Sequence, residues 1–182
     1  MFIIDPFILG YKLFGYKIIV YPLLIVILGG ISWGIIVNQL PEIYSFIFLG
    51  IYFGFSYGII SKLFGFERYI LPSLILTVLL ILCLVLTLFA GLYFGAYFIP
   101  IIIGNMVFSL LLFMIDHKYF EMPINIKYIC FYLFAALFVI TIIYFVIIID
   151  WKKNILWLYL FAYPLVIYIY IQISIVCRLD YR

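Results

Sequence analysis

Charged residues are scarce in this sequence of 182 residues: Asp, Glu, Lys and Arg make up only 9%, whereas 71% of the residues are apolar and the mean hydropathy is +1.43. Ordinary soluble domains are about half apolar and about a quarter charged. A soluble fold of this size leaves roughly a quarter or more of its unfolded surface in water, and disordered chains are polar and highly charged. The composition therefore excludes both classes and predicts an integral membrane protein.

Residue patterns for metal binding and catalysis are also lacking. The three cysteines, Cys83, Cys130 and Cys177, are far apart in apolar stretches, so we expect them to pack as small apolar side chains. The single histidine, His117, lies in the segment 116–121, which offers too few ligands for a metal. We expect a solvated cytoplasmic turn there. The sequence has no glycine-rich phosphate loop, nucleophile elbow or HExxH motif, and we expect neither a cofactor nor a bound metal.

Six stretches are apolar enough and long enough to cross a hydrocarbon core of about 30 Å, which takes about 20 helical residues. In order along the chain they are residues 18–37, 43–60, 69–89, 96–115, 126–149 and 155–177. The sequence therefore predicts an all-α fold, a polytopic helical membrane protein with about six transmembrane helices. We expect three hairpins in a single domain over residues 18–182.

Residues 1–17 precede the first span and carry Lys12, Lys17, Tyr11 and Phe14. We expect this amphipathic segment to lie in the membrane interface. It lacks the pattern of a secretory signal, since Asp, Pro and Gly interrupt its apolar run and no small-residue cleavage site follows.

Lysine and arginine residues alternate between the predicted connections. Eight of them fall before the first span or after the second, fourth and sixth: Lys12, Lys17, Lys62, Arg68, Lys118, Lys127, Arg178 and Arg182. On the opposite side only Lys152 and Lys153 occur. By the positive-inside rule this asymmetry predicts that both termini are cytoplasmic. We expect a bacterial cytoplasmic membrane, with an organellar inner membrane as the alternative.

A short internal similarity links two of the predicted hairpins. Residues 12–15 and 62–65 are both Lys-Leu-Phe-Gly, and each copy is followed by a proline seven positions after the glycine, at Pro22 and Pro72. A duplication would explain the match, and so would chance in so biased a composition. The sequence leaves both explanations open.

Glycine recurs at helical spacing in two of the predicted spans. Gly50, Gly54 and Gly58 follow one another every four residues in the second span, and Gly30 and Gly34 do so in the first. This spacing puts the glycines on one helix face, where another backbone can approach closely. The face is either a contact within the helix bundle, which we favour, or an interface with another subunit.

Apart from Lys127, the second residue of the fifth, the predicted spans contain no Asp, Glu, Lys, Arg or His. Ion-coupled pumps and proton relays carry such residues at membrane depth, and embedded hydrolases need acid–base groups or a metal there. We therefore do not expect an enzyme. Asn105 and Ser109 share a face of the fourth span and predict either an interhelical hydrogen bond, which we favour, or a polar cavity. Thr77, Thr87 and Thr141 are expected to bond to their own helix backbone.

Tyrosine is abundant in the sixth span. Tyr163 and Tyr170 lie deep in it, and their hydroxyl groups are candidates, together with Asn105 and Ser109, for lining a cavity. Packing within the bundle is the alternative that we favour.

These features favour a non-enzymatic membrane subunit that acts as an anchor, sensor or assembly component of a larger complex. Ile, Phe and Tyr have AT-rich codons, and their abundance is typical of an AT-rich or recently acquired gene, so immunity and phage-defence systems are among the candidate complexes. We expect other protein subunits as partners, either copies of this chain or a soluble cytoplasmic protein, and no direct contact with nucleic acid. The alternative function is a small-solute transporter or channel component with a cavity near Asn105.

The candidate partner contacts are cationic or histidine side chains on the predicted cytoplasmic side. They are Lys12, Lys17, Lys62, Arg68, His117, Lys118, Arg178 and Arg182.

Overall fold

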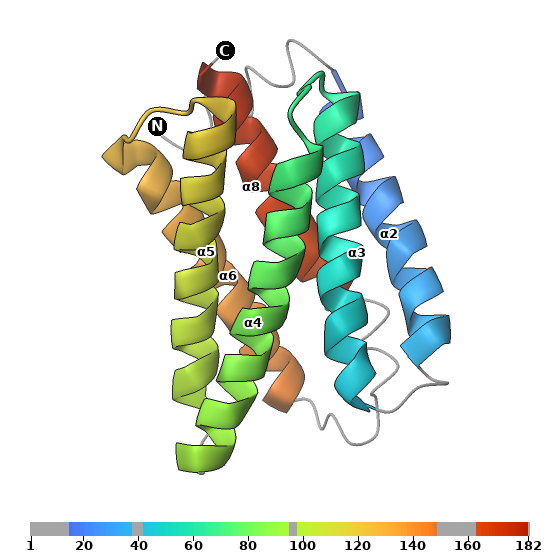
Figure 1. Cartoon of the computed structure of the whole chain (residues 1–182), viewed down its shortest axis with the longest axis vertical. Helices are drawn as coiled ribbons and strands as arrows, with labels where there is room; N and C mark the ends of the chain where they lie inside the picture. Colours follow the sequence, from blue (N-terminus) through green and yellow to red (C-terminus); the bar gives the residue numbers. More distant parts are fainter. Residues whose placement is uncertain (1–14, 38–41, 95–97, 149–162, 182) are drawn as a thin grey trace.

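The computed structural model describes the backbone of residues 15–37, 42–94, 98–148 and 163–181, and the side chains of residues 15–32, 47–93, 99–144 and 164–181. These residues form six α-helices (Figure 1), and the described ranges contain no strand. The helices are α2 (Lys17–Val37), α3 (Glu42–Leu63), α4 (Ile70–Phe94), α5 (Phe98–Phe120), α6 (Ile126–Ile148) and α8 (Tyr163–Tyr181).

Each of the six predicted stretches coincides with one helix, which confirms the all-α prediction. Several helix ends differ from the prediction, because α3, α4, α5 and α8 continue to Leu63, Phe94, Phe120 and Tyr181. The prediction ended each span where hydropathy falls, whereas backbone hydrogen bonding continues through polar and charged residues. Most of the predicted interfacial segment and the start of the predicted sixth span, residues 155–162, lie outside the described residues.

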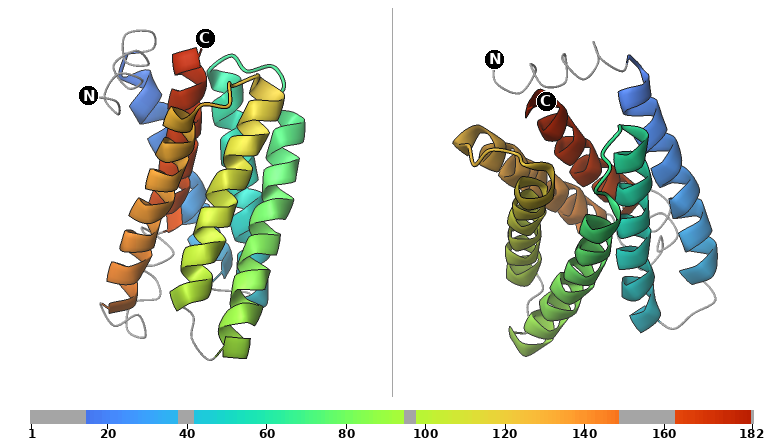
Figure 2. Two further views of the ribbon diagram at one scale, coloured as in Figure 1. Left: turned by 90° about the vertical axis from the view of Figure 1, so that its left-hand side faces the viewer. Right: turned by 45° about the horizontal axis from the view of Figure 1, so that its top comes forward.

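Consecutive helices run in alternating directions (Figures 1 and 2). One end of the bundle therefore holds the start of α2, the α3–α4 connection, the α5–α6 connection and the end of α8. We call this the charged end, because it carries every charged side chain that the structure describes. These side chains are Lys17, Lys62, Glu67, Arg68, Asp116, Lys118, Glu121, Lys127, Arg178 and Asp180.

The helices differ in their number of neighbours. α8 packs against α2, α3, α5 and α6, whereas α4 packs mainly against α3 and α5 on the outside of the bundle (Figure 2). The buried side chains of α3, α5, α6 and α8 therefore form the core, and α8 is the element that connects the other three.

The outside of the bundle is covered by large apolar side chains. On α4, Leu74, Val78, Leu82 and Leu86 recur every four residues and are each more than half exposed. By length and composition α4, α5, α6 and α8 can each cross a membrane, and the described parts of α2 and α3 are shorter apolar helices.

The two Lys-Leu-Phe-Gly segments end in the same backbone conformation. Gly15 has φ 59° and Gly65 has φ 78°, in the left-handed region that glycine adopts without steric cost. After α3, the N–H of Phe66 donates to the carbonyl oxygen of Ser61 at 3.0 Å, which closes the helix end in the manner of a Schellman motif. Gly65 thus ends α3 and turns the chain into α4.

Candidate functional site

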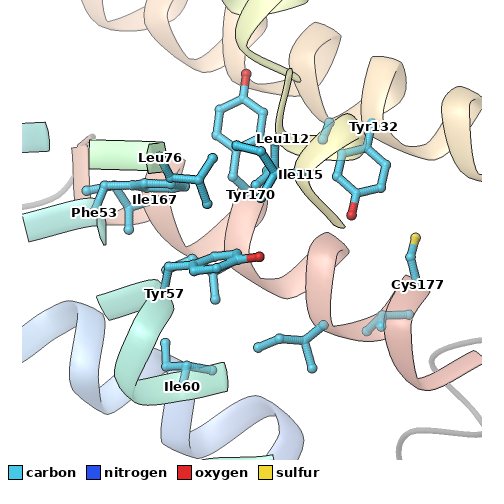
Figure 3. Close-up of a cluster of buried hydrophobic side chains, with 14 of the residues drawn as sticks. Phe53, Tyr57, Ile60, Leu76, Leu112, Ile115, Tyr132, Ile167, Tyr170 and Cys177 are labelled. Atoms are coloured by element: carbon cyan, nitrogen blue, oxygen red, sulfur yellow. The ribbon is translucent and has the colours of Figure 1, made fainter. Parts of the chain in front are cut away.

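The carboxylate of Asp116, on α5, lies at the centre of a buried polar cluster near the charged end. Its side chain is fully buried, and hydroxyl groups from three other helices donate hydrogen bonds to it. Tyr57 on α3 donates to Oδ1 at 2.5 Å, Ser174 on α8 donates to Oδ2 at 2.5 Å, and Tyr132 on α6 also donates to Oδ2. Figure 3 shows the hydroxyl groups of Tyr57 and Tyr132 approaching this region from different helices.

The guanidinium group of Arg178, on α8, is the positive charge of this cluster. Its Nε lies 3.9 Å from Asp116 Oδ1 and donates to the carbonyl oxygen of Ser174 at 3.2 Å, and its Nη1 donates to Ser61 Oγ at 3.1 Å. The side chain is only 2% exposed. Its remaining nitrogen, Nη2, is buried and has no hydrogen-bond partner in the part of the chain that the structure describes.

Three aromatic rings surround the same guanidinium group. The rings of Phe120, Phe66 and Tyr57 lie 4.2, 4.4 and 4.9 Å from the guanidinium carbon. The quadrupole of an aromatic ring attracts a cation over its face, and the attraction grows where water is excluded. The rings therefore compensate part of the cost of burying Arg178 and hold the plane of its guanidinium group.

Helical spacing explains why these side chains meet. On α8, Tyr170, Ser174 and Arg178 follow one another every four residues, and on α5 Asn105, Ser109 and Asp116 lie on one face. The two faces point toward each other in the bundle interior, where α3 adds Tyr57 and Ser61, and α6 adds Tyr132. We call Asp116, Arg178, Tyr57, Ser61, Tyr132 and Ser174 the Asp116 cluster.

Asn105, Ser109 and Tyr170 form a second set of polar contacts deeper in the bundle. The hydroxyl of Tyr170 donates to Asn105 Oδ1 at 3.2 Å, and Asn105 Nδ2 donates to the carbonyl oxygen of Ile101 at 2.8 Å. Ser109 donates to the carbonyl oxygen of Tyr132 on α6. The structure thus gives Asn105 and Ser109 interhelical hydrogen bonds, while the side chain of Tyr163 lies outside the described residues.

The expected threonine contacts are confirmed. Thr77, Thr87 and Thr141 donate to the carbonyl oxygens four residues earlier, at 3.0, 2.7 and 2.9 Å. The hydrogen-bond donors of these hydroxyl groups are therefore satisfied within their own helices.

Gly50, Gly54 and Gly58 face α4. A Cβ atom on Gly54 would lie 1.8 Å from Thr77 Oγ1 and 2.7 Å from the carbonyl oxygen of Ser73, and Gly50 and Gly58 are also close to this helix. The glycine face of α3 is thus a contact within the chain. Gly30 similarly contacts Pro164 of α8, and the side-chain surroundings of Gly34 lie outside the described residues.

The expectation of a solvated turn at residues 116–121 is wrong. α5 continues to Phe120, Asp116 is fully buried, and only at Glu121, with φ 58°, does the helix end. His117 is half-buried, and its Nδ1 lies 2.5 Å from the carbonyl oxygen of Met122, which it can reach as a donor across the turn. The helix continues because the charge of Asp116 is compensated from α3, α6 and α8, which no local hydropathy window detects.

The expectation that Arg178 contacts a partner is also wrong, because its side chain is buried within the chain. Among the other candidate contacts, Lys17, Lys62, Arg68 and Lys118 are exposed at the charged end. Lys12 and Arg182 lie outside the described residues. Lys127, which is partly exposed, forms an ion pair of 2.8 Å with Asp180.

Sequence reasoning missed the pairing of Asp116 with Arg178, although the four-residue spacing from Tyr170 through Ser174 to Arg178 is a signal for it. Gln172 of α8 is 4% exposed, and its side-chain amide has no hydrogen-bond partner among the described residues. The cysteines are unpaired; Cys177 is buried, Cys83 is half-buried and Cys130 is exposed.

The Asp116 cluster can hold four helices in one arrangement, since every member contacts a different helix from its own. Three hydroxyl donors and a nearby guanidinium group stabilise the buried carboxylate. In the described part of the chain no three His, Cys, Asp or Glu side chains gather to hold a metal ion. No family model, curated protein or solved structure matches this chain.

Proposed function

We propose that this chain is an integral membrane protein that crosses the bilayer six times, with its charged end in the cytoplasm, and serves as an anchoring or assembly subunit of a complex. Support for the bilayer comes from the apolar outer surface and from the four helices long enough to cross it. The excess of basic residues on the side of the charged end supports the orientation.

The exposed cations of the charged end are the observation that carries the subunit role. Lys17, Lys62, Arg68 and Lys118 are exposed there, against the exposed carboxylates of Glu67 and Glu121. The Asp116 cluster joins α3 and α5, which carry Lys62 and Lys118, so these two cations keep their relative positions. A fixed, mainly basic surface is complementary to an acidic surface on a soluble partner.

Reversing the charges at the end of α3 and in the connection that follows it tests this role. The variant Lys62→Glu/Arg68→Glu should lose a stoichiometric soluble protein that the wild-type chain retains after purification in mild detergent. The matched control, Lys62→Arg/Arg68→Lys, keeps both charges and should retain it. Equal recovery from the two variants, or no stoichiometric protein with the wild type, would contradict the subunit role.

Orientation can be measured separately. In a variant without the native cysteines, Glu67→Cys lies at the charged end and Tyr93→Cys, where the native side chain is 86% exposed, lies at the other. A membrane-impermeant thiol reagent added to intact cells should label the second cysteine and not the first. The reverse pattern would overturn the orientation.

A transporter or channel component is the second candidate, and the polar contacts between α5 and α8 favour it. They lead from the Asn105–Tyr170 hydrogen bond to the Asp116–Arg178 pair through the bundle interior. Asn105→Leu should then abolish solute uptake by vesicles containing the protein while leaving its partner bound. If Asn105→Leu changes neither uptake nor assembly, the cavity hypothesis fails.

A further inference from the structure

A groove of about 440 Å³ runs between α2 and α3 on the outside of the bundle. Its walls are apolar and open to the surroundings: Leu28 on α2 is 64% exposed and Phe55 on α3 is 67% exposed. At its base Tyr52 lies against Gly29, where a Cβ atom would come within 2.1 Å of the tyrosine ring, and the Tyr52 hydroxyl donates to the carbonyl oxygen of Val26. The contact of α2 with α3 therefore closes the base of the groove.

The few hydroxyl groups that line the groove do not require a polar ligand. The Ser32 hydroxyl donates to the carbonyl oxygen of Leu28 at 2.9 Å within its own helix, and Ser56 is buried. The occupant that these walls suit is a flexible hydrocarbon chain.

The depth of the groove corresponds to one leaflet. On α3 its lining extends from Ile59 to Phe48, which are three and fourteen residues from Lys62. At about 1.5 Å per residue these positions lie about 5 and about 21 Å below that lysine. Half of a hydrocarbon core is about 15 Å thick, so the groove spans the leaflet on the side of the charged end.

Each helix of the groove carries an exposed lysine nearer the charged end, beyond the lining residues, and the Lys62 ammonium lies 5.8 Å from the centre of the Tyr69 ring. Phe48, Phe55 and Lys62 recur every seven residues on one face of α3, and Lys17, Tyr21 and Ile25 recur every four residues on α2. Lys17 and Lys62 are both exposed, and Tyr21 is 38% exposed between Lys17 and the groove. Ammonium groups and a phenol hydroxyl at headgroup depth are complementary to a phosphate.

We propose that this groove binds an anionic phospholipid of the leaflet at the charged end, with one acyl chain between α2 and α3 and the phosphate at Lys17 and Lys62. The inference rests on the bilayer placement proposed above. It assigns the lipid to a site formed by one helix pair and goes beyond general contact with the membrane.

Native mass spectrometry of protein released from nanodiscs of phosphatidylglycerol and phosphatidylcholine in equal amounts tests the site. We expect one phosphatidylglycerol per chain to be retained in preference. Lys17→Gln/Lys62→Gln should reduce that preference about tenfold or more, since each lysine near the headgroups attracts an anionic lipid. Ile51→Trp, which fills the groove, should release both lipids.

Matched controls lie outside the groove. Lys118→Gln removes a cation from the same end of the bundle, and Leu82→Trp enlarges an exposed side chain of α4; neither should change lipid retention. Equal retention of the two lipids would overturn the inference. So would a loss of preference in Lys118→Gln as large as that in Lys17→Gln/Lys62→Gln. Recovery of the chain outside the membrane fraction would instead overturn the bilayer placement, so the two failures are distinguishable.

Discussion

α4 and α8 differ most clearly in how apolar they are and in how deeply they are buried. The most apolar 18 residues within Ile70–Tyr93 of α4 have a mean hydropathy of 3.0, yet only 11% of them are buried, whereas Pro164–Tyr181 of α8 has a mean hydropathy of 1.3 and is 61% buried. In water-soluble proteins the apolar helices are the buried ones. Here the most apolar helix faces outward and the most polar faces inward, which supports an apolar solvent around the bundle.

The same two helices are held by different interactions. α4 packs on α3 through glycines that let Thr77 and Ser73 approach the facing backbone. α8 is held by the ion pair of Arg178 with Asp116 and by hydrogen bonds from Ser174 and Tyr170. Where lipid removes the hydrophobic drive between helices, close packing and polar contacts are the two remaining ways to join them.

The largest expected effect is the loss of the buried cation on α8. Arg178→Leu leaves the Asp116 carboxylate without its counter-charge, and removing one partner of a buried pair costs about 3–5 kcal/mol of unfolding free energy. Detergent-induced unfolding followed by circular dichroism measures this loss. The double variant Arg178→Leu/Asp116→Leu should recover part of the stability, and a double variant as unstable as the sum of the two single ones would contradict coupling through this pair.

A charge on the outward face of α4 should have the next largest effect. Leu82 is 51% exposed, and a lysine at the centre of a membrane helix costs about 2.5–3.5 kcal/mol of insertion free energy. Leu82→Lys should therefore reduce the fraction of chain inserted in a translocation assay, whereas Leu82→Phe should insert normally. If the lysine variant inserted as well as the wild type, α4 would not face lipid.

A substitution in the glycine contact between α3 and α4 should cost less free energy than the two changes above. In Gly54→Leu the new side chain meets Thr77 and Ser73, and overpacking of this kind costs about 1–3 kcal/mol of unfolding free energy. Ile47→Leu, a change at an exposed position of the same helix outside the groove, is the control and should be neutral. Unchanged stability of Gly54→Leu in the same unfolding experiment would show that α3 and α4 do not approach as described.

The smallest effect is expected for a single hydrogen bond of α8. Tyr170→Phe removes the donor to Asn105, and interhelical hydrogen bonds in membranes contribute about 0.6 kcal/mol on average. The expected decrease is therefore a fraction of that for Arg178→Leu. A loss as large as that of the ion pair would mean that the deeper polar contacts, and not the Asp116 cluster, hold α8 in place.

The helices could be predicted from the sequence because each is a long apolar run, and the single-sided charge placement could be predicted from the spacing of Lys and Arg. The Asp116 cluster could not, since its members come from helices far apart in the chain and the predicted fourth and sixth spans end directly before Asp116 and Arg178. From their neighbours in the sequence alone, Asp116 and Arg178 are predicted to be solvated residues at the ends of helices. Only the packing of α3, α5, α6 and α8 shows that they compensate each other.

The central place of α8 has a consequence for the order in which the bundle forms. α8 follows α2, α3, α5 and α6 in the chain, so these helices are synthesised before the element that fills the space between them. Until Arg178 arrives, the Asp116 carboxylate, in the last turns of α5, lacks the counter-charge that it has in the folded bundle. The space between α2, α3, α5 and α6 therefore closes only after α8 has joined them.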